Sequence, residues 1–85
     1  MARNQYGLQF VMQGMFDKAE QHFVEAIKLN PAFSEAHSNY GLLLANIGQI
    51  DRAIQQQKEA LNINPRYAIA QFRLGMILGR NGRTT

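Results

Sequence analysis

The chain repeats itself with a period of 34 residues, and this period limits the possible folds more than any other feature. Glycines fall on it as Gly7, Gly41 and Gly75. Residues 1–34 laid over residues 35–68 share 12 identical positions, which include both residues of an Asn-Pro pair. A period of this length is typical of arrays in which each repeat is one small unit stacked on the next. We therefore expect an array fold and a function of the kind that arrays perform.

Each period contains two segments in which apolar residues recur at helical spacing. We expect helices at residues 2–13, 17–30, 34–46, 51–62 and from residue 68 onward. Glycine separates the two helices of a period, and an Asn-Pro pair closes the second one, because the residue before a proline is pushed out of the α region. The sequence thus predicts one all-α domain over residues 1–85 with five helices. Its expected units are repeat one (1–33), repeat two (34–67) and a partial repeat three (68–85).

Small residues recur where two helices of one repeat should meet. Because helices approach closely only where side chains are short, we expect Gly7 to face Ala19 or its neighbourhood and Gly41 to face Ala53. The third repeat should turn its own glycine and leucines inward in the same way. Gln57 stands where the first repeat has a phenylalanine. We expect this glutamine to weaken the packing of the fourth helix.

Acidic residues mark the expected starts of the second and fourth helices. Asp17 precedes Glu20 by three residues, the spacing of a capping box, and Asp51 stands one period after Asp17. Each aspartate comes just before an apolar run of helical period. We therefore interpret both as residues that start helices, and not as catalytic acids or bases.

The repeated motif is Tyr-Gly-x-x-Phe, a second glycine seven residues after the first, and then alanine, an aromatic residue, alanine and proline. Its members are Tyr6, Gly7, Phe10, Gly14, Ala19, Phe23, Ala26 and Pro31, then Tyr40, Gly41, Leu44, Gly48, Ala53, Ala60 and Pro65, then Leu74, Gly75, Leu78 and Gly82. This pattern resembles the tetratricopeptide-repeat (TPR) family. The resemblance implies a right-handed superhelical array of antiparallel helix pairs, an α-solenoid. Arg3, His37 and Gln71 depart from it, since the family often has tryptophan or another large residue there.

In TPR proteins the first helix of each repeat lines a concave groove that holds an extended peptide or a partner helix. The resemblance therefore implies a non-catalytic protein–protein interaction module with a peptide-binding groove. Its matched positions are Asn4, Leu8, Met12, Ser38, Asn39, Leu42, Asn46, Ile69, Phe72, Arg73, Met76 and Arg80. The apolar members together could make an exposed patch of several hundred Å², the size that marks partner sites. Alternatively, some of these side chains pack among themselves or against the terminal helix.

Two narrower resemblances concern the ligand. One TPR subclass grips a C-terminal carboxylate with five lysine, asparagine and arginine positions, which here hold Asn4, Leu8, Asn39, Ile69 and Arg73. Only Asn39 and Arg73 keep that chemistry, so a C-terminal carboxylate is not the expected ligand. Residues 36–41 are also similar to repeats of the O-linked N-acetylglucosamine transferases, where an asparagine at the place of Asn39 holds the substrate backbone. That ladder of asparagines is incomplete in this chain.

No pattern indicates catalysis, a cofactor or a metal. The chain has no cysteine, and His22 and His37 are separated by 15 residues on different expected helices. No strand precedes the glycines, and no Gly-Lys-Ser/Thr follows them, so a phosphate loop is not expected. RNA-binding pentatricopeptide arrays have a typical period of 35 and read bases through many repeats. We therefore expect no nucleic-acid partner.

The composition places the chain away from the membrane. The longest apolar run is residues 42–45, far too short to span a bilayer, and no long apolar segment follows the arginine at position 3, so no secretory signal is expected. The lack of cysteine fits a reducing compartment, so we expect a cytoplasmic location. Charge is uneven, because no acidic residue follows Glu59 whereas arginines stand at 66, 73, 80 and 83. Such an end can attract nucleic acid, anionic lipid or an acidic peptide, although solvated charge on helix surfaces is the simpler interpretation for at least two of the four arginines.

Two hypotheses compete with a peptide-binding groove. Leu74 and Leu78 should pack on a second helix that residues 68–85 do not supply, so they could form a self-association face. A homodimer or an exchange of helices between copies would cover them. Alternatively, the chain is the docking segment of a larger enzyme.

Overall fold

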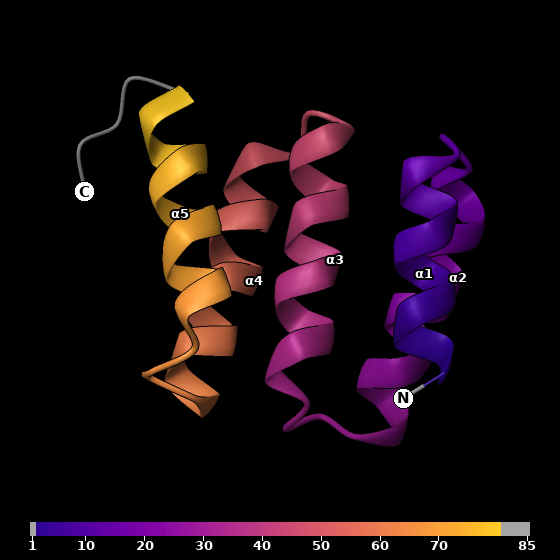
Figure 1. Ribbon diagram of the computed structural model, residues 1–85, viewed down its shortest axis with the longest axis horizontal. Helices are drawn as coiled ribbons and strands as arrows, with labels where there is room; N and C mark the ends of the chain where they lie inside the picture. The colour runs from indigo at the N-terminus through magenta and orange to yellow at the C-terminus, as the bar shows by residue number, and fades with distance from the viewer. Residues whose placement is uncertain (1, 81–85) are drawn as a thin grey trace.

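The five helices of the computed structural model alternate between two layers (Figure 1). They are α1 (Ala2–Met12), α2 (Phe16–Leu29), α3 (Ser34–Asn46), α4 (Ile50–Ile63) and α5 (Ala68–Arg80). The structure describes the backbone of residues 2–80 and the side chains of residues 7–79, and no strand occurs in that part of the chain. The predicted all-α array is confirmed, and each expected helix lies within two residues of its observed bounds where both ends are described.

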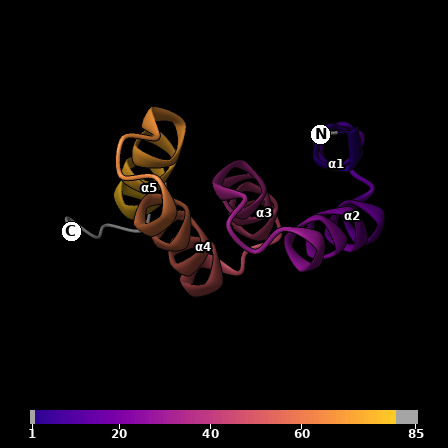
Figure 2. The same ribbon diagram turned by 90° about the horizontal axis from the view of Figure 1, so that it is seen from below.

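The helices form a curved row of antiparallel pairs. Each helix contacts the next one along the chain, and α3 also contacts α1 and α5. Viewed from below, α1, α3 and α5 line the concave side, whereas α2 and α4 lie on the convex side (Figure 2). The first helices of successive repeats therefore share one surface, and the second helices support it from behind.

Glycine ends the first helix of each complete pair. Gly14 has a φ of 77° and Gly48 a φ of 84°, a region that favours glycine because it lacks a Cβ atom. The N–H of Gly14 donates to the carbonyl of Val11 at 3.1 Å, and the N–H of Met15 donates to the carbonyl of Phe10 at 2.8 Å. These two bonds make a Schellman motif, and the equivalent pair recurs around Gly48.

The second helices begin differently from the prediction. Met15 precedes α2 and Gln49 precedes α4, and neither residue makes a side-chain capping bond. Asp17 lies within the first turn of α2, where its negative charge interacts favourably with the helix dipole. Its side chain does not cap the helix. Glu20 accepts a hydrogen bond of 2.8 Å from the Tyr40 hydroxyl of α3. The predicted capping box is therefore wrong, because the glutamate bonds to a neighbouring helix instead.

Tyr40 joins three helices. Its hydroxyl donates to Glu20 of α2 and accepts from Nη2 of Arg52 in α4, both at 2.8 Å. Burial raises the pKa of Tyr40, and the bond to the Glu20 carboxylate raises it further, whereas Arg52 lowers it. The phenol therefore stays protonated at neutral pH and can donate to Glu20. This network ties the first pair to the second.

The core runs along the seam between the two layers. Its buried members are Val11, Ala19, Phe23, Tyr40, Leu43, Leu44, Ala53, Ile54 and Ile77. Leu74 and Leu78 are half-buried and pack against this core. They are therefore not the exposed pair that the self-association hypothesis assumed.

In both complete pairs, a glycine of the first helix lets a side chain of the second helix approach closely. We call this contact the glycine seat. A Cβ atom added to Gly7 would lie 2.7 Å from Cζ of Phe23. A Cβ atom on Gly41 would lie 3.2 Å from the carbonyl oxygen of Ala53 and 2.5 Å from Nε2 of Gln57. The predicted close approach of Gly41 and Ala53 is confirmed, and in each pair the larger side chain four residues after the alanine reaches the glycine.

Gln57 does not weaken this packing. It is completely buried, and its Oε1 accepts a 2.6 Å hydrogen bond from the Ser38 hydroxyl. Its Nε2 donates to the Ser38 carbonyl at 2.8 Å. The buried amide is bonded at both ends and leaves no polar atom unpaired, so the loose packing that the sequence predicted for α4 is not observed.

Pro31 and Pro65 occupy equivalent positions, and a different type of side chain bonds the carbonyl of each. Nε2 of His37 lies 2.9 Å from the carbonyl oxygen of Pro31, and one period later Nε2 of Gln71 donates to the carbonyl of Pro65 at the same distance. Nδ1 of His37 also lies 2.8 Å from Oε1 of Gln56 in α4. His37 and Gln71, which depart from the family pattern, thus hold the loops between the helix pairs.

Candidate functional site

A small pocket opens between α3 and α5, which both line the concave side. It has a volume of about 30 Å³. Its walls are Leu42, Ala45, Asn46, Arg73, Met76 and Ile77. Four of these six residues belong to the groove that the sequence predicted. Because the walls are mostly apolar and the volume is small, the pocket suits a small apolar side chain.

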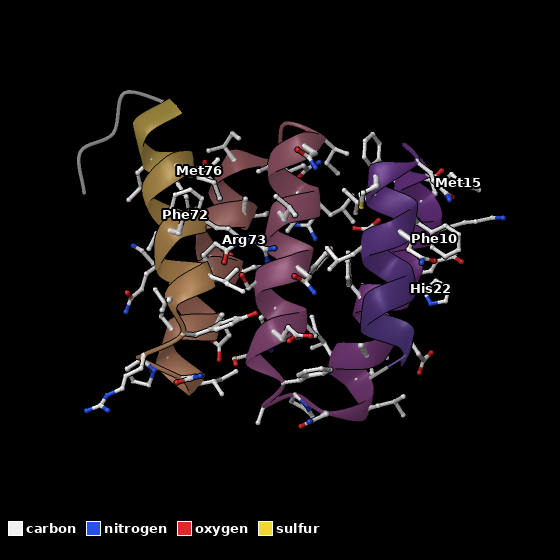
Figure 3. All side chains as sticks on the ribbon, in the orientation of Figure 1. Phe10, Met15, His22, Phe72, Arg73 and Met76 are labelled. Atoms are coloured by element: carbon white, nitrogen blue, oxygen red, sulfur yellow. The ribbon has the colours of Figure 1, made fainter. Side chains whose placement is uncertain are left out.

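Arg73 forms the polar edge of this pocket and lies on α5 beside Phe72 (Figure 3). Its Nη1 donates to Oδ1 of Asn39 at 2.8 Å and to Oγ of Ser38 at 3.1 Å. Burial lowers the pKa of the guanidinium, whereas Tyr67 and Glu35 raise it. Arginine remains charged at neutral pH in spite of such a shift. The side chain therefore joins α3 to α5 and brings a positive charge to the pocket.

Two of the predicted groove residues are buried by these contacts. Ser38 is 0% exposed and Asn39 is 2% exposed. Ser38 lies between Gln57 of α4 and Arg73 of α5, while Asn39 accepts a bond from the same arginine. Neither side chain offers a ligand a free surface in this structure. Their contacts instead fix the angle between α3 and α5, and hence the shape of the pocket.

The N-terminal part of the predicted groove differs from the centre. Leu8 is half-buried and packs against the core, whereas Met12 is 86% exposed at the end of α1. The side chains of Asn4 and Arg80 lie outside the described residues. Of the predicted groove residues on α1 whose side chains are described, Met12 is therefore the exposed one.

The outer residues of α5 are the most exposed part of the predicted groove. Ile69 is 48%, Phe72 69% and Met76 42% exposed. Figure 3 shows Phe72 and Met76 on α5 at the opposite end of the array from Phe10 and Met15. Met76 also lines the pocket, whereas Phe72 stands one period after the buried Ser38. Phe72 thus occupies a position that a neighbouring helix covers in α3.

Ile77 lines the pocket but was not predicted as a site residue. It is 6% exposed and belongs to the core. The period could have indicated it, because the equivalent Leu43 is also buried. Repeat spacing indicates that Ile77 is buried, but it does not indicate that a pocket opens beside it.

The surface carries no cluster suited to metal binding within the residues that the structure describes. His22 packs against the ring of Phe10, with centroids 5.1 Å apart, and His37 bonds a loop carbonyl. None of the described helices is both long and apolar enough to cross a membrane. The feature of the described surface that suits a ligand is therefore the apolar pocket with a cationic edge.

Comparison with known sequences agrees with the repeat. A profile described as tetratricopeptide repeat matches residues 22–55. The match begins in α2, includes all of α3 and ends in α4. A search of curated proteins found no relative that matches the chain.

Proposed function

Because this chain is a tetratricopeptide-repeat protein, a family of protein–protein interaction modules that are in general non-catalytic, we propose that its concave side binds a peptide. The pocket between α3 and α5 is the observation that carries the proposal. An extended segment or one edge of a partner helix would insert a small apolar side chain between Leu42 and Met76. No reaction is assigned to the protein.

The chemistry of the pocket supports this ligand class. Met76 is 42% exposed although it borders an apolar pocket, and methionine adapts readily to differently shaped partners. The amide of Asn46 can donate to and accept from a peptide bond beside the pocket. Apolar walls with a few polar groups at the rim are typical of sites that bind in this way. The lack of cysteine fits a protein that works in a reducing compartment such as the cytoplasm.

Selection from a phage-displayed library of random 12-residue peptides tests the proposal. The immobilised protein is the unaltered 85-residue chain, and enriched peptides are then measured against Leu42→Glu and Met76→Glu. A carboxylate in the apolar pocket should weaken binding by about tenfold or more, since burying an unpaired charge is costly. Circular dichroism should show unchanged helical content in both variants.

Gln55→Glu is the matched control, because Gln55 is exposed on α4 at the convex side. It should leave the affinity of the same peptides unchanged. Failure to enrich peptides, or enriched peptides that bind Leu42→Glu as well as the original chain, would contradict the proposal.

A further inference from the structure

Methionine is the sulfur-containing residue of this chain, because the sequence has four methionines and no cysteine. The structure describes the side chains of Met12, Met15 and Met76, and all three are exposed. Peroxide oxidises exposed methionine to methionine sulfoxide, which turns a flexible apolar side chain into a polar one. The effect of such oxidation on the protein depends on what surrounds each sulfur atom.

Met76 differs from the other two methionines because it lines the pocket between α3 and α5. All six wall residues come from these two helices, so access to Met76 through the pocket does not depend on the side of α5 that faces away from α3. The pocket volume of about 30 Å³ is roughly twice the space that one water molecule needs. Hydrogen peroxide can therefore reach Met76 from the concave side.

Two hydrogen-bond donors line the pocket together with Met76. Arg73 stands three residues before Met76, a spacing that places both on one face of α5 (Figure 3). Its Nη1 donates to Ser38 and Asn39, and a guanidinium has three further N–H donors. The amide of Asn46 adds a donor from α3. The pocket therefore contains groups that can bond a sulfoxide oxygen.

A sulfoxide at Met76 would change the kind of side chain that the pocket accepts. The thioether of reduced methionine is only a weak acceptor, so it keeps the wall apolar. The sulfoxide oxygen is polar and can accept a bond from Arg73. An apolar ligand side chain would have to break this bond or bury the oxygen beside itself, and both are unfavourable. Oxidation of Met12 or Met15 adds an oxygen atom outside the pocket and should not have this effect.

We propose that Met76 is a site of reversible oxidation and that its sulfoxide keeps apolar side chains out of the pocket. The O–O bond of hydrogen peroxide breaks, one oxygen atom bonds to the sulfur, and the other leaves as water, so the sulfur loses two electrons and the peroxide gains them. A methionine sulfoxide reductase reverses the step with two thiols, which form a disulfide while the oxygen leaves as water. The loss of peptide affinity rests on the function proposed above, whereas the change in the pocket does not.

Nuclear magnetic resonance tests the change in the pocket without a ligand. The ¹⁵N-labelled 85-residue chain is treated with hydrogen peroxide, and mass spectrometry of its fragments locates each added oxygen atom. Oxidation should move the side-chain N–H signals of Arg73 and the backbone amide signals of Leu42 and Asn46, which lie across the pocket on α3. The same treatment of Met76→Leu should leave these signals in place. Leucine is similar to methionine in volume, so this variant should keep its helices in circular dichroism.

Peptide affinity tests the consequence for binding. The probe is a peptide enriched from the random library on the reduced chain, and its dissociation constant is measured before and after peroxide. Oxidation should raise this constant at least about fivefold, because it places a polar oxygen in an apolar pocket. Reduction by methionine sulfoxide reductases with dithiothreitol should restore the affinity.

Two variants separate Met76 from the other methionines. In Met76→Leu, peroxide should leave the dissociation constant at its value before treatment. The double variant Met12→Leu, Met15→Leu is the matched control, since it removes two exposed methionines that do not line the pocket. After peroxide it should lose affinity by the same factor as the original chain.

Three results would overturn the proposal. The first is that Met76 remains reduced after Met12 and Met15 have been oxidised. The second is that the signals of Leu42 and Asn46 stay in place although Met76 carries the added oxygen. The third is that peroxide weakens binding to Met76→Leu and to the original chain by the same factor. If the library yields no peptide, the proposed function fails, and the magnetic resonance signals alone support or overturn the change in the pocket.

Discussion

The two complete helix pairs have the same backbone plan but close it with opposite chemistry. In the first pair the ring of Phe23 lies against Gly7, whereas in the second the amide of Gln57 lies against Gly41. Both side chains are completely buried. The glycine seat therefore selects for the size and reach of a side chain, and not for its polarity.

Polarity is decided by the residue one turn before the glycine. Ser38 supplies a hydroxyl and a carbonyl, and both ends of the Gln57 amide bond to it. The first pair gains from removing a large ring from water, while the second gains from hydrogen bonds that leave no buried polar atom alone. We expect the first kind of seat to contribute more to stability.

Removal of the ring in the first pair should have the largest effect. Phe23→Ala leaves a cavity beside Gly7, and it should cost about 3–5 kcal/mol of the free energy of unfolding. Gln57→Ala should cost less, because it removes less apolar surface from the core. Urea denaturation followed by circular dichroism measures both. Equal losses for the two variants would show that the seats are energetically alike.

Loss of the polar contact in the second pair should have an intermediate effect. Gln57→Leu keeps much of the volume but leaves the Ser38 carbonyl without the amide that donates to it, a cost of about 1–3 kcal/mol. Adding Ser38→Ala removes the hydroxyl, so the double variant should be more stable than the sum of the two single losses predicts. Strict additivity in the urea measurements would mean that the two side chains are not coupled.

Alanine should have opposite effects at an occupied and an empty seat. At Gly75 a methyl group meets nothing, so Gly75→Ala should stabilise the protein by about 0.5–1 kcal/mol through helix propensity. At Gly7 the same methyl group would meet the ring of Phe23 and should destabilise the protein. The melting temperatures of the two variants should therefore move in opposite directions. A fall for Gly75→Ala would indicate that another helix lies against Gly75 in solution.

Exchange of the loop-holding side chain should have the smallest effect. Gln71 bonds the Pro65 carbonyl just as His37 bonds that of Pro31, so His37→Gln should change stability by no more than about 0.5 kcal/mol. His37→Ala removes the contact and should cost about 1 kcal/mol. Thermal unfolding compares the two. A glutamine variant as unstable as the alanine variant would show that the contact of the imidazole with Gln56 stabilises the protein more than its contact with Pro31.

The repeat made the fold predictable, because its signals are local. Gly14 and Gly48 terminate helices by their own backbone geometry, and each Asn-Pro pair closes a helix without help from distant residues. The spacing of small residues also located the Gly41 seat, since both partners of a pair lie within one period. These features depend on the chain within 34 residues and so can be read from it.

The candidate site was less predictable, because it depends on neighbours. Ser38 and Asn39 carry groove positions, yet Arg73 from the next repeat covers them. Gly75 stands one period after Gly41, but among the described residues nothing lies within 4 Å of a Cβ atom added to it. Gln57 was misjudged because its polarity was visible in the sequence and its partner on α3 was not. A period reports which face a residue occupies, but only the adjacent repeat decides whether that face is covered.

The bond from Arg73 to Ser38 also bears on how the chain folds. It spans 35 residues, about one period, and it joins parts of the chain that are adjacent in the array. Apart from such bonds, the helices mainly contact the helix that precedes or follows them in the chain, and these contacts need only short loops to close, which favours fast folding. Each helix pair can then form on the pair already folded, so a damaged end should unravel while the rest of the array persists.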